Sequence, residues 1–326
     1  MNPRERVKLG RTPLSVSRVG LGTAPLAGLF ESVDEDQALG VIGRAWEAGI
    51  RFFDTAPLYG HGLGELRLGR VLREQPRDEF TLATKVGRLL RADAPPEPGQ
   101  AFRGVPAVNP VFDFTYDGVM RSVEESLERL RLSRIDILHI HDPDNHYDVA
   151  LNGAYRALAQ LRADGIISAV GAGMNQAEML TRFAREGDFD CFLLAGRYTL
   201  LEQGAMQELM PLCLERGIAI IAGGVYNSGI LADPKPGAHY DYRTAPAALL
   251  ERAQRLRAVC ARHGVPLKAA AVQFPLGHPA VAAVVVGCRS TAQLDESLEM
   301  FEVEIPPGMW QELKADGLLQ EDVPTP

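Results

Sequence analysis

The chain has 326 residues, of which 46% are hydrophobic, and a formal net charge of −8 at pH 7 with acidic and basic residues interspersed. This composition predicts a large buried core, and the lack of a basic stripe argues against nucleic acid as a partner. The N-terminal segment 1–6 is polar and no apolar run approaches the roughly 20 residues of a membrane helix, so we expect a cytoplasmic protein without a membrane partner.

Short apolar runs alternate with helical patterns along the first half of the chain. Residues 7–17, around Gly10-Arg11-Thr12-Pro13, predict a β-hairpin ahead of the main fold. Residues 19–23 predict the first strand of that fold, and its exit at Gly22 and Thr23 lets the backbone approach a ligand closely. Further strands are predicted near residues 52, 80 and 135, with helices at residues 34–48, 64–73 and 117–132.

One long irregular stretch, residues 91–116, follows the third strand of the main fold. A loop of this length inside a compact fold is usually functional or disordered. Because it leaves the end of a strand, we interpret it as a lid over the site that offers apolar contacts from Phe102, Phe112, Phe114 and Tyr116. A linker without a function is the alternative interpretation.

The same alternation continues through the second half of the chain. Strands are predicted near residues 167, 190, 218 and 281, and helices at residues 152–164, 176–185, 202–216, 246–263 and 291–301. The eight strands predict a single α/β domain over residues 1–326, a (β/α)8 TIM barrel with an N-terminal β-hairpin and a long loop after strand 3. A last helix around Trp310 and a proline-rich end are expected to pack across the barrel and then fray.

Reactive side chains end three successive strands. Asp54 closes one strand and Tyr59 follows in the loop, while Lys85 and His141 end the next two strands. Each residue alone has an ordinary structural explanation as a cap or a core residue. Together they suit proton transfer, because an ammonium lowers the pKa of a nearby phenol, an acid keeps that ammonium charged, and an imidazole hydrogen-bonds the reacting oxygen.

These four residues resemble the Asp, Tyr, Lys and His tetrad of the aldo-keto reductase superfamily, in the same order and with similar spacing. The segments 141–146, 196–203 and 223–229 are similar to those of the aldose 1-dehydrogenase branch, which includes enzymes acting on L-fucose, D-threo-aldoses, L-galactose and pyridoxal. The resemblance implies an NAD(P)-dependent oxidoreductase that oxidises an aldose at C1 to its lactone, with Tyr59 as the general base. It also implies a small sugar or aldehyde as the partner, and a monomer or small homo-oligomer.

The resemblance further implies where the nicotinamide cofactor binds. Asn175 is a shifted match to the family's Ser-Asn pair, Ala195 stands for its glutamine, and Arg197 or Tyr226 could supply the missing contacts. Backbone groups of one glycine-rich loop are expected to approach the pyrophosphate: Gly223, Gly224, Asn227, Ser228 and Gly229.

The segment 287–296 matches the family's adenosine-phosphate position. Gly287 and Gln293 stand where NADP-using relatives carry cations, so we expect NAD, with Glu296 also at the site. Arg289 could restore one cation, which leaves NADP as the alternative.

The run His139-Ile140-His141-Asp142-Pro143-Asp144-Asn145-His146 raises a metal hypothesis. We interpret His139 as a core residue and expect no metal. Asp142, Asp144 and His146 are expected to contact substrate hydroxyls, with Tyr226 also near the substrate. The four cysteines lack CxxC spacing and are expected to be reduced buried thiols. Pyridoxal or another aldehyde is the alternative substrate, and a metal-dependent barrel hydrolase and a non-catalytic regulatory subunit are the alternative functions.

Overall fold

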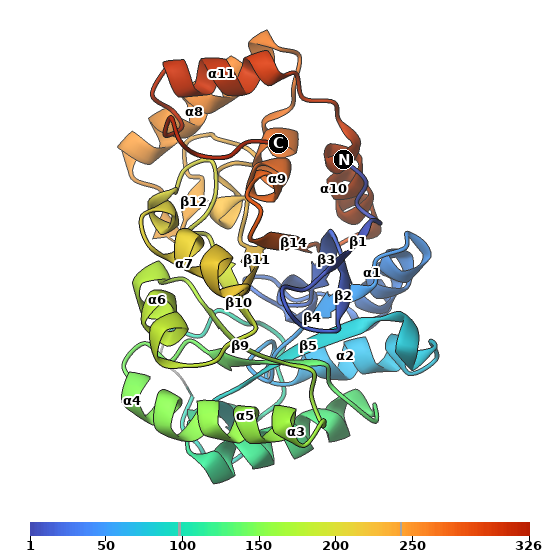
Figure 1. The fold of residues 1–326 in the computed structure, drawn as a ribbon. Coiled ribbons are helices and arrows are strands. Elements are labelled where there is room, and N and C mark those ends of the chain that lie inside the picture. The colour runs from blue at the N-terminus through green and yellow to red at the C-terminus, as the bar shows by residue number, and fades with distance from the viewer. Residues whose placement is uncertain (97–98, 242) are drawn as a thin grey trace.

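Eight parallel strands close into a barrel in the computed structural model, which describes residues 1–96, 99–241 and 243–326 (Figure 1). The predicted (β/α)8 barrel is confirmed, and each strand lies where the hydrophobic pattern predicted it. The barrel strands are β3 (Val19–Gly22), β4 (Phe52–Asp54), β5 (Thr81–Val86), β8 (Ile137–His141), β9 (Ala169–Met174), β10 (Cys191–Ala195), β11 (Ala219–Gly223) and β14 (Val281–Gly287).

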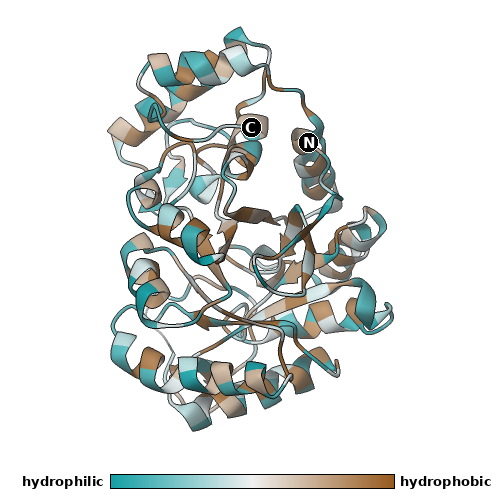
Figure 2. Cartoon of the chain, in the orientation of Figure 1, coloured by the Kyte–Doolittle hydropathy of each residue, from teal (hydrophilic) through white to brown (hydrophobic). Residues whose placement is uncertain are grey.

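Helices surround the barrel, and their apolar faces pack on the outer face of the sheet (Figures 1 and 2). In α1, for example, Asp34 caps the first turn by accepting a hydrogen bond from the backbone of Gln37, and four apolar residues at helical spacing are buried. The helices are α1 (Glu35–Glu47), α2 (Leu63–Leu72), α3 (Tyr116–Leu130), α4 (Tyr147–Val149), α5 (Tyr155–Ala163), α6 (Ala177–Glu186), α7 (Leu209–Arg216), α8 (Ala247–Arg262), α9 (Leu267–Gln273), α10 (Thr291–Glu302) and α11 (Pro307–Ala315).

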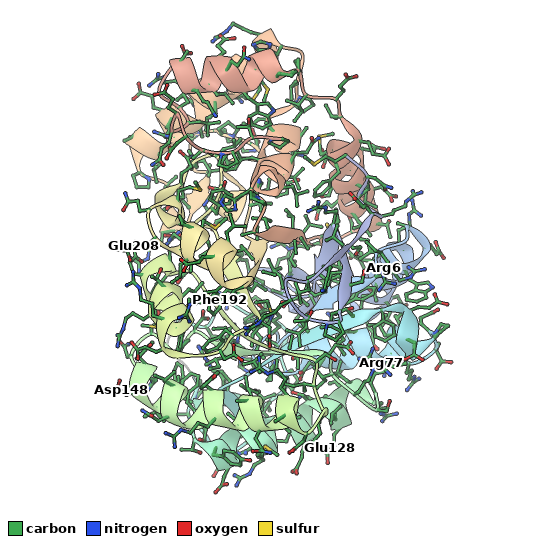
Figure 3. All side chains as sticks on the ribbon, in the orientation of Figure 1. Arg6, Arg77, Glu128, Asp148, Phe192 and Glu208 are labelled. Atoms are coloured by element: carbon green, nitrogen blue, oxygen red, sulfur yellow. The ribbon has the colours of Figure 1, made fainter. Side chains whose placement is uncertain are left out.

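The core has two layers. The larger layer lies between the sheet and the helices, and it includes Phe192 of β10, which Figure 3 labels within the molecule. The smaller layer fills the inside of the barrel, where Phe52 and Ile137 meet Leu9 and Val16 of the N-terminal hairpin. This hairpin, β1 (Arg6–Lys8) paired with β2 (Ser15–Ser17), closes the amino-terminal end of the barrel and leaves the carboxyl ends of the strands open.

The predicted long loop is partly ordered, which corrects its description as irregular. Its two ends form an antiparallel pair, β6 (Arg88–Arg91) with β7 (Asn109–Phe112), and Phe102 makes a β-bridge with Leu29. Pro110 argued against a strand, but a two-stranded ribbon has free edges that tolerate proline. Glu97 and Pro98 of the predicted loop lie outside the described residues.

The second half differs from the prediction in one helix boundary and in two elements that were not predicted. The helix predicted from residue 202 begins at Leu209, two residues before Pro211, because proline fits only the first turn of a helix. Helix α9 was missed, and so was a short antiparallel pair, β12 (His239–Tyr240) with β13 (Arg243–Thr244). At the C-terminal end, the predicted helix around Trp310 is present as α11, and the side chain of Val323, just before the proline-rich end, is fully buried. In the described ranges, no helix is both long and apolar enough to cross a bilayer.

Candidate active site

The carboxyl ends of β4, β5 and β8 bring the four predicted catalytic residues together. The Nζ atom of Lys85 donates to both carboxylate oxygens of Asp54, at 2.5 and 2.7 Å, and to the carbonyl oxygen of Thr55 at 2.9 Å. Both side chains are almost completely buried. Their neighbouring strands pair directly in the barrel, so the position of Lys85 is set by the sheet and by its ion pair with Asp54.

The Lys85 ammonium and the His141 imidazole both lie close to the Tyr59 ring. The Lys85 Nζ atom is 4.6 Å from the centre of the Tyr59 ring, and the His141 ring meets it edge-on at 5.7 Å. The loop that carries Tyr59 turns at Gly60, which has a positive φ of 59°, and a Cβ atom there would lie 2.3 Å from the Ala27 carbonyl oxygen. Only glycine permits this close approach, so Gly60 holds the phenol in place.

His141 is buried and neutral at neutral pH. Burial lowers its pKa well below the ordinary value, and the nearby charges of Lys85 and Arg88 lower it further. Its Nδ1 atom is buried with no hydrogen-bond partner among the described residues, whereas Nε2 lies 3.5 Å from Asp142 Oδ2. The arrangement fits a neutral imidazole that carries its proton on Nε2 and can donate it in a hydrogen bond.

His139 lies in the core, as predicted from its pattern. It is fully buried, and burial lowers its pKa to about 3. A Cβ atom at Gly171 would lie 2.2 Å from its Nδ1 atom, so the ring occupies space that this glycine leaves free. In the described part of the chain, no group of three or more His, Cys, Asp and Glu side chains could hold a metal ion.

A cavity of about 490 Å³ runs from the tetrad along the strand ends toward α10. Asp54 and Tyr59 line one part of it, and the β3–α1, β11–α8 and β14–α10 loops line much of the rest. Most of the predicted cofactor residues line this cavity: Gly22, Asn175, Gly223, Gly224, Asn227, Ser228, Gly229, Gly287, Arg289, Gln293 and Glu296. Asn175 does not cap the next helix, because the cap position is Gln176.

Two predicted cofactor residues do not line the cavity. Arg197 pairs with Asp241, with Nη1 and Nη2 at 3.0 and 2.6 Å from its two carboxylate oxygens, and it is Asp241 that borders the cavity. Thr23 is buried, and its hydroxyl bonds that of Thr55 at 2.8 Å. Both contacts join distant segments of the chain, so spacing within a motif could not reveal them.

The β14–α10 end of the cavity is already organised by its own hydrogen bonds. Ser290 caps α10, and the Gln293 side chain accepts a hydrogen bond from the Arg289 backbone at 2.8 Å. The Arg289 guanidinium donates to the Leu29 carbonyl oxygen at 2.9 Å. Glu296 pairs with Lys268 at 2.6 Å, a cavity-lining cation that sequence reasoning missed because α9 was not predicted.

The predicted substrate residues lie in two different places. Asp142 and His146 lie on the His141 side of the site, where the His146 ring contacts Phe112 at 4.8 Å between centres. Tyr226 instead borders the cavity near Ser297 and Glu296, among the predicted cofactor residues. Arg88 was missed, although it is buried and donates to the His141 carbonyl oxygen at 2.7 Å.

Comparisons with known proteins identify relatives with similar sequences and a similar fold. A D-threo-aldose 1-dehydrogenase from Pseudomonas sp is 45% identical, with 96% of each chain covered. A pyridoxal 4-dehydrogenase from Microbacterium luteolum is 42% identical, covering 97% of this chain and 98% of the relative. Among solved structures, an aldo-keto reductase from Bacillus halodurans in its holo form superposes with a TM-score of 0.75 at 24% identity, covering 98% of this chain and 97% of that chain.

The model of the Aldo/keto reductase family matches residues 18–316, which include the whole barrel and all four tetrad positions. Members of this family use nicotinamide cofactors, and the relatives at 45% and 42% identity are dehydrogenases, so the chain is an NAD(P)-dependent oxidoreductase. From this match and the closed eight-stranded barrel, we conclude that the chain belongs to the aldo/keto reductase family.

Proposed function

We propose that this enzyme is an aldose 1-dehydrogenase that oxidises a sugar such as L-fucose at C1 to the lactone, with NAD as the cofactor. The observation that supports it most is the contact of Tyr59 with both the Lys85 ammonium and the neutral His141 imidazole. The similarity over nearly the full length to a D-threo-aldose 1-dehydrogenase supports the choice of substrate.

In the proposed reaction, Tyr59 removes the proton from the C1 hydroxyl of the sugar. Lys85 stabilises the phenolate form of Tyr59 by its positive charge, and Asp54 keeps Lys85 charged and oriented. The Nε2–H group of His141 donates a hydrogen bond to the same substrate oxygen as it becomes a carbonyl oxygen. A nicotinamide cofactor held in the cavity would supply the acceptor for the hydride from C1.

The cavity fits a dinucleotide in several respects. It has the volume of a small-molecule site, and six glycines are among the residues that line it. The Oδ1 atom of Asn227 is buried and has no hydrogen-bond partner among the described residues, while its amide donates to the Gly196 carbonyl oxygen at 3.0 Å. Asn227 and the neighbouring glycines would therefore hold the cofactor, together with Tyr226.

A substrate panel tests the proposed activity. We expect initial rates of NADH formation with L-fucose or L-galactose to exceed those with pyridoxal. Pyridoxal is the second candidate because a pyridoxal 4-dehydrogenase is 42% identical to this chain. Turnover of pyridoxal alone would replace the proposed substrate and leave the family unchanged.

The preference for NAD is the first specific prediction. The Glu296 carboxylate would repel a 2′-phosphate, and it neutralises Lys268, the cation that could bind one. Replacing Glu296 with Gln should therefore raise kcat/KM for NADP relative to NAD by about tenfold, the effect of one charge-assisted hydrogen bond. Gly287 is unsuited to such a test, because a Cβ atom there would lie 2.7 Å from the Pro25 ring.

Glu299, exposed on the same helix, provides the matched control. Glu299→Gln removes the same charge and should leave the cofactor ratio unchanged. A wild-type enzyme that prefers NADP, with a preference that Arg289→Ala abolishes, would show that Arg289 binds the phosphate and that the choice of NAD is wrong.

A further inference from the structure

A carboxylate lies beside the atom of His141 that would hold the reacting oxygen. Asp142 follows β8 directly, and its Oδ2 atom is 3.5 Å from His141 Nε2. Its backbone has a positive φ of 41°, and its amide donates to the Gly173 carbonyl oxygen at 3.1 Å, which fixes the start of the loop. A non-glycine residue with this backbone conformation is uncommon and suggests that the position of its side chain matters.

Arg88 keeps this carboxylate next to the site. Its Nη1 atom donates to the His141 carbonyl oxygen at 2.7 Å, and its Nη2 atom lies 4.0 Å from Asp142 Oδ2. The guanidinium also stacks on the Phe112 ring, with its central carbon 4.0 Å from the ring centre. Arg88 is thus held on three sides. Burial raises the pKa of Asp142 to about 6, and the charge of Arg88 opposes this shift, so the carboxyl group is mainly ionised at neutral pH.

The Asp142 carboxylate can accept hydrogen bonds from a ligand. Its Oδ2 atom lies 3.5 Å from His141 Nε2 and 4.0 Å from Arg88 Nη2, and its side chain is 38% exposed. An ionised carboxylate accepts hydrogen bonds only, so the group that completes this site must be a donor.

We propose that Asp142 binds the hydroxyl on the carbon next to the reacting carbon, so that the enzyme selects aldoses with a free 2-hydroxyl. This inference rests on the proposed oxidation at C1. The two vicinal oxygens of a sugar stand about one hydrogen-bond length apart, close to the 3.5 Å between His141 Nε2 and Asp142 Oδ2. One oxygen then accepts from His141 while its neighbour donates to Asp142, and both contacts are made at once.

The charge of Asp142 sets the expected preference for a sugar over its 2-deoxy analogue. A hydrogen bond to a charged group changes affinity by roughly 10- to 100-fold, and a site built to bond a hydroxyl discriminates strongly against an analogue that lacks it. We therefore expect wild type to prefer L-fucose over 2-deoxy-L-fucose, or L-galactose over its 2-deoxy analogue, by about this factor in kcat/KM.

Two variants test the assignment without straining the backbone. Asp142→Gly removes the carboxylate and Asp142→Asn removes only its charge, and both residues tolerate a positive φ. We expect the ratio between the sugar and its 2-deoxy analogue to fall to near one in the glycine variant and to an intermediate value in the asparagine variant. The ratio, rather than the rate with either sugar, is the readout, because Asp142 also lies 3.5 Å from His141 Nε2 and its replacement changes the surroundings of that catalytic atom.

Asp148→Asn is the matched control. Asp148 lies in the same segment but is exposed at the edge of the molecule (Figure 3), and removing its charge should leave the ratio at the wild-type value. Equal ratios in wild type and Asp142→Gly would overturn the assignment of Asp142 while the proposed function stands. If wild type oxidises no aldose, the proposed function fails and this inference fails with it.

Discussion

Tyr59 is the residue on which the proposed chemistry depends most directly. Replacing it with phenylalanine keeps the ring that contacts Lys85 and His141 but removes the hydroxyl that would take the substrate proton. General base catalysis contributes about 10²–10⁴-fold, so kcat should fall by that factor. Cofactor binding, measured by fluorescence titration, should stay at the wild-type level. A variant with near-normal kcat would remove the phenol from the mechanism.

We expect His139 to affect how the stability of the protein depends on pH, rather than its activity. Its pKa is lowered to about 3 in the folded protein, whereas the ordinary value is 6.5. Between pH 6.5 and about pH 3, His139 is protonated in the unfolded chain but neutral in the folded protein. Protonation therefore favours the unfolded chain, so the free energy of unfolding is highest above pH 6.5 and decreases as the pH falls below it. Between about pH 7.5 and about pH 5.5, the loss for one such histidine is about 1.4 kcal/mol.

The variant His139→Leu should therefore lose less stability on acidification than wild type, by about that amount. Urea unfolding at the two pH values measures the difference. His239, which is exposed, is the control, and His239→Leu should keep the wild-type dependence on pH. An unchanged dependence in His139→Leu would mean that His139 takes up a proton within the folded barrel.

At the level of elements, the N-terminal hairpin stabilises the barrel from the end opposite the site. Leu9 is fully buried in the inner core layer, and Lys8 beside it is exposed. Leu9→Ala should lower the free energy of unfolding by about 2–5 kcal/mol, because a buried leucine leaves a cavity. Lys8→Ala should change it by less than about 0.5 kcal/mol. Both variants should keep the wild-type kcat, and a large fall in kcat for Leu9→Ala would mean that the hairpin supports the tetrad directly.

The elements also show what the sequence predicted and what it could not. All eight barrel strands were predicted, because strand-length apolar runs alternate with helical spacing along the chain. Helix α9 was missed because nearly all its residues are buried, which leaves no polar face to reveal its period. The β6–β7 pair was missed because Pro110 lies inside it. At the site, the strand-end motif predicted the grouping of the tetrad, but Arg88 and Lys268 reach the site only through tertiary packing.

At the scale of the whole molecule, the hairpin that stabilises the fold and the residues of the active site lie at opposite ends of the barrel. The hairpin closes one end, and the tetrad and the cavity occupy the other, where loops from many strands meet. The region around Asp142 and Arg88 lies at the tetrad, while Glu296 and Lys268 lie near α10. Substitutions at these two places should act independently, those at the first on the choice of sugar and those at the second on the choice of cofactor.

The most direct test of the central claim, oxidation at C1, follows the hydride itself. L-Fucose deuterated at C1 is incubated with the enzyme and NAD, and the reduced cofactor and the sugar product are analysed by mass spectrometry. We predict deuterium in the reduced cofactor and a lactone without it, with both products lost in Tyr59→Phe. Reduced cofactor without deuterium, or a product that retains deuterium at C1, would contradict the proposed reaction.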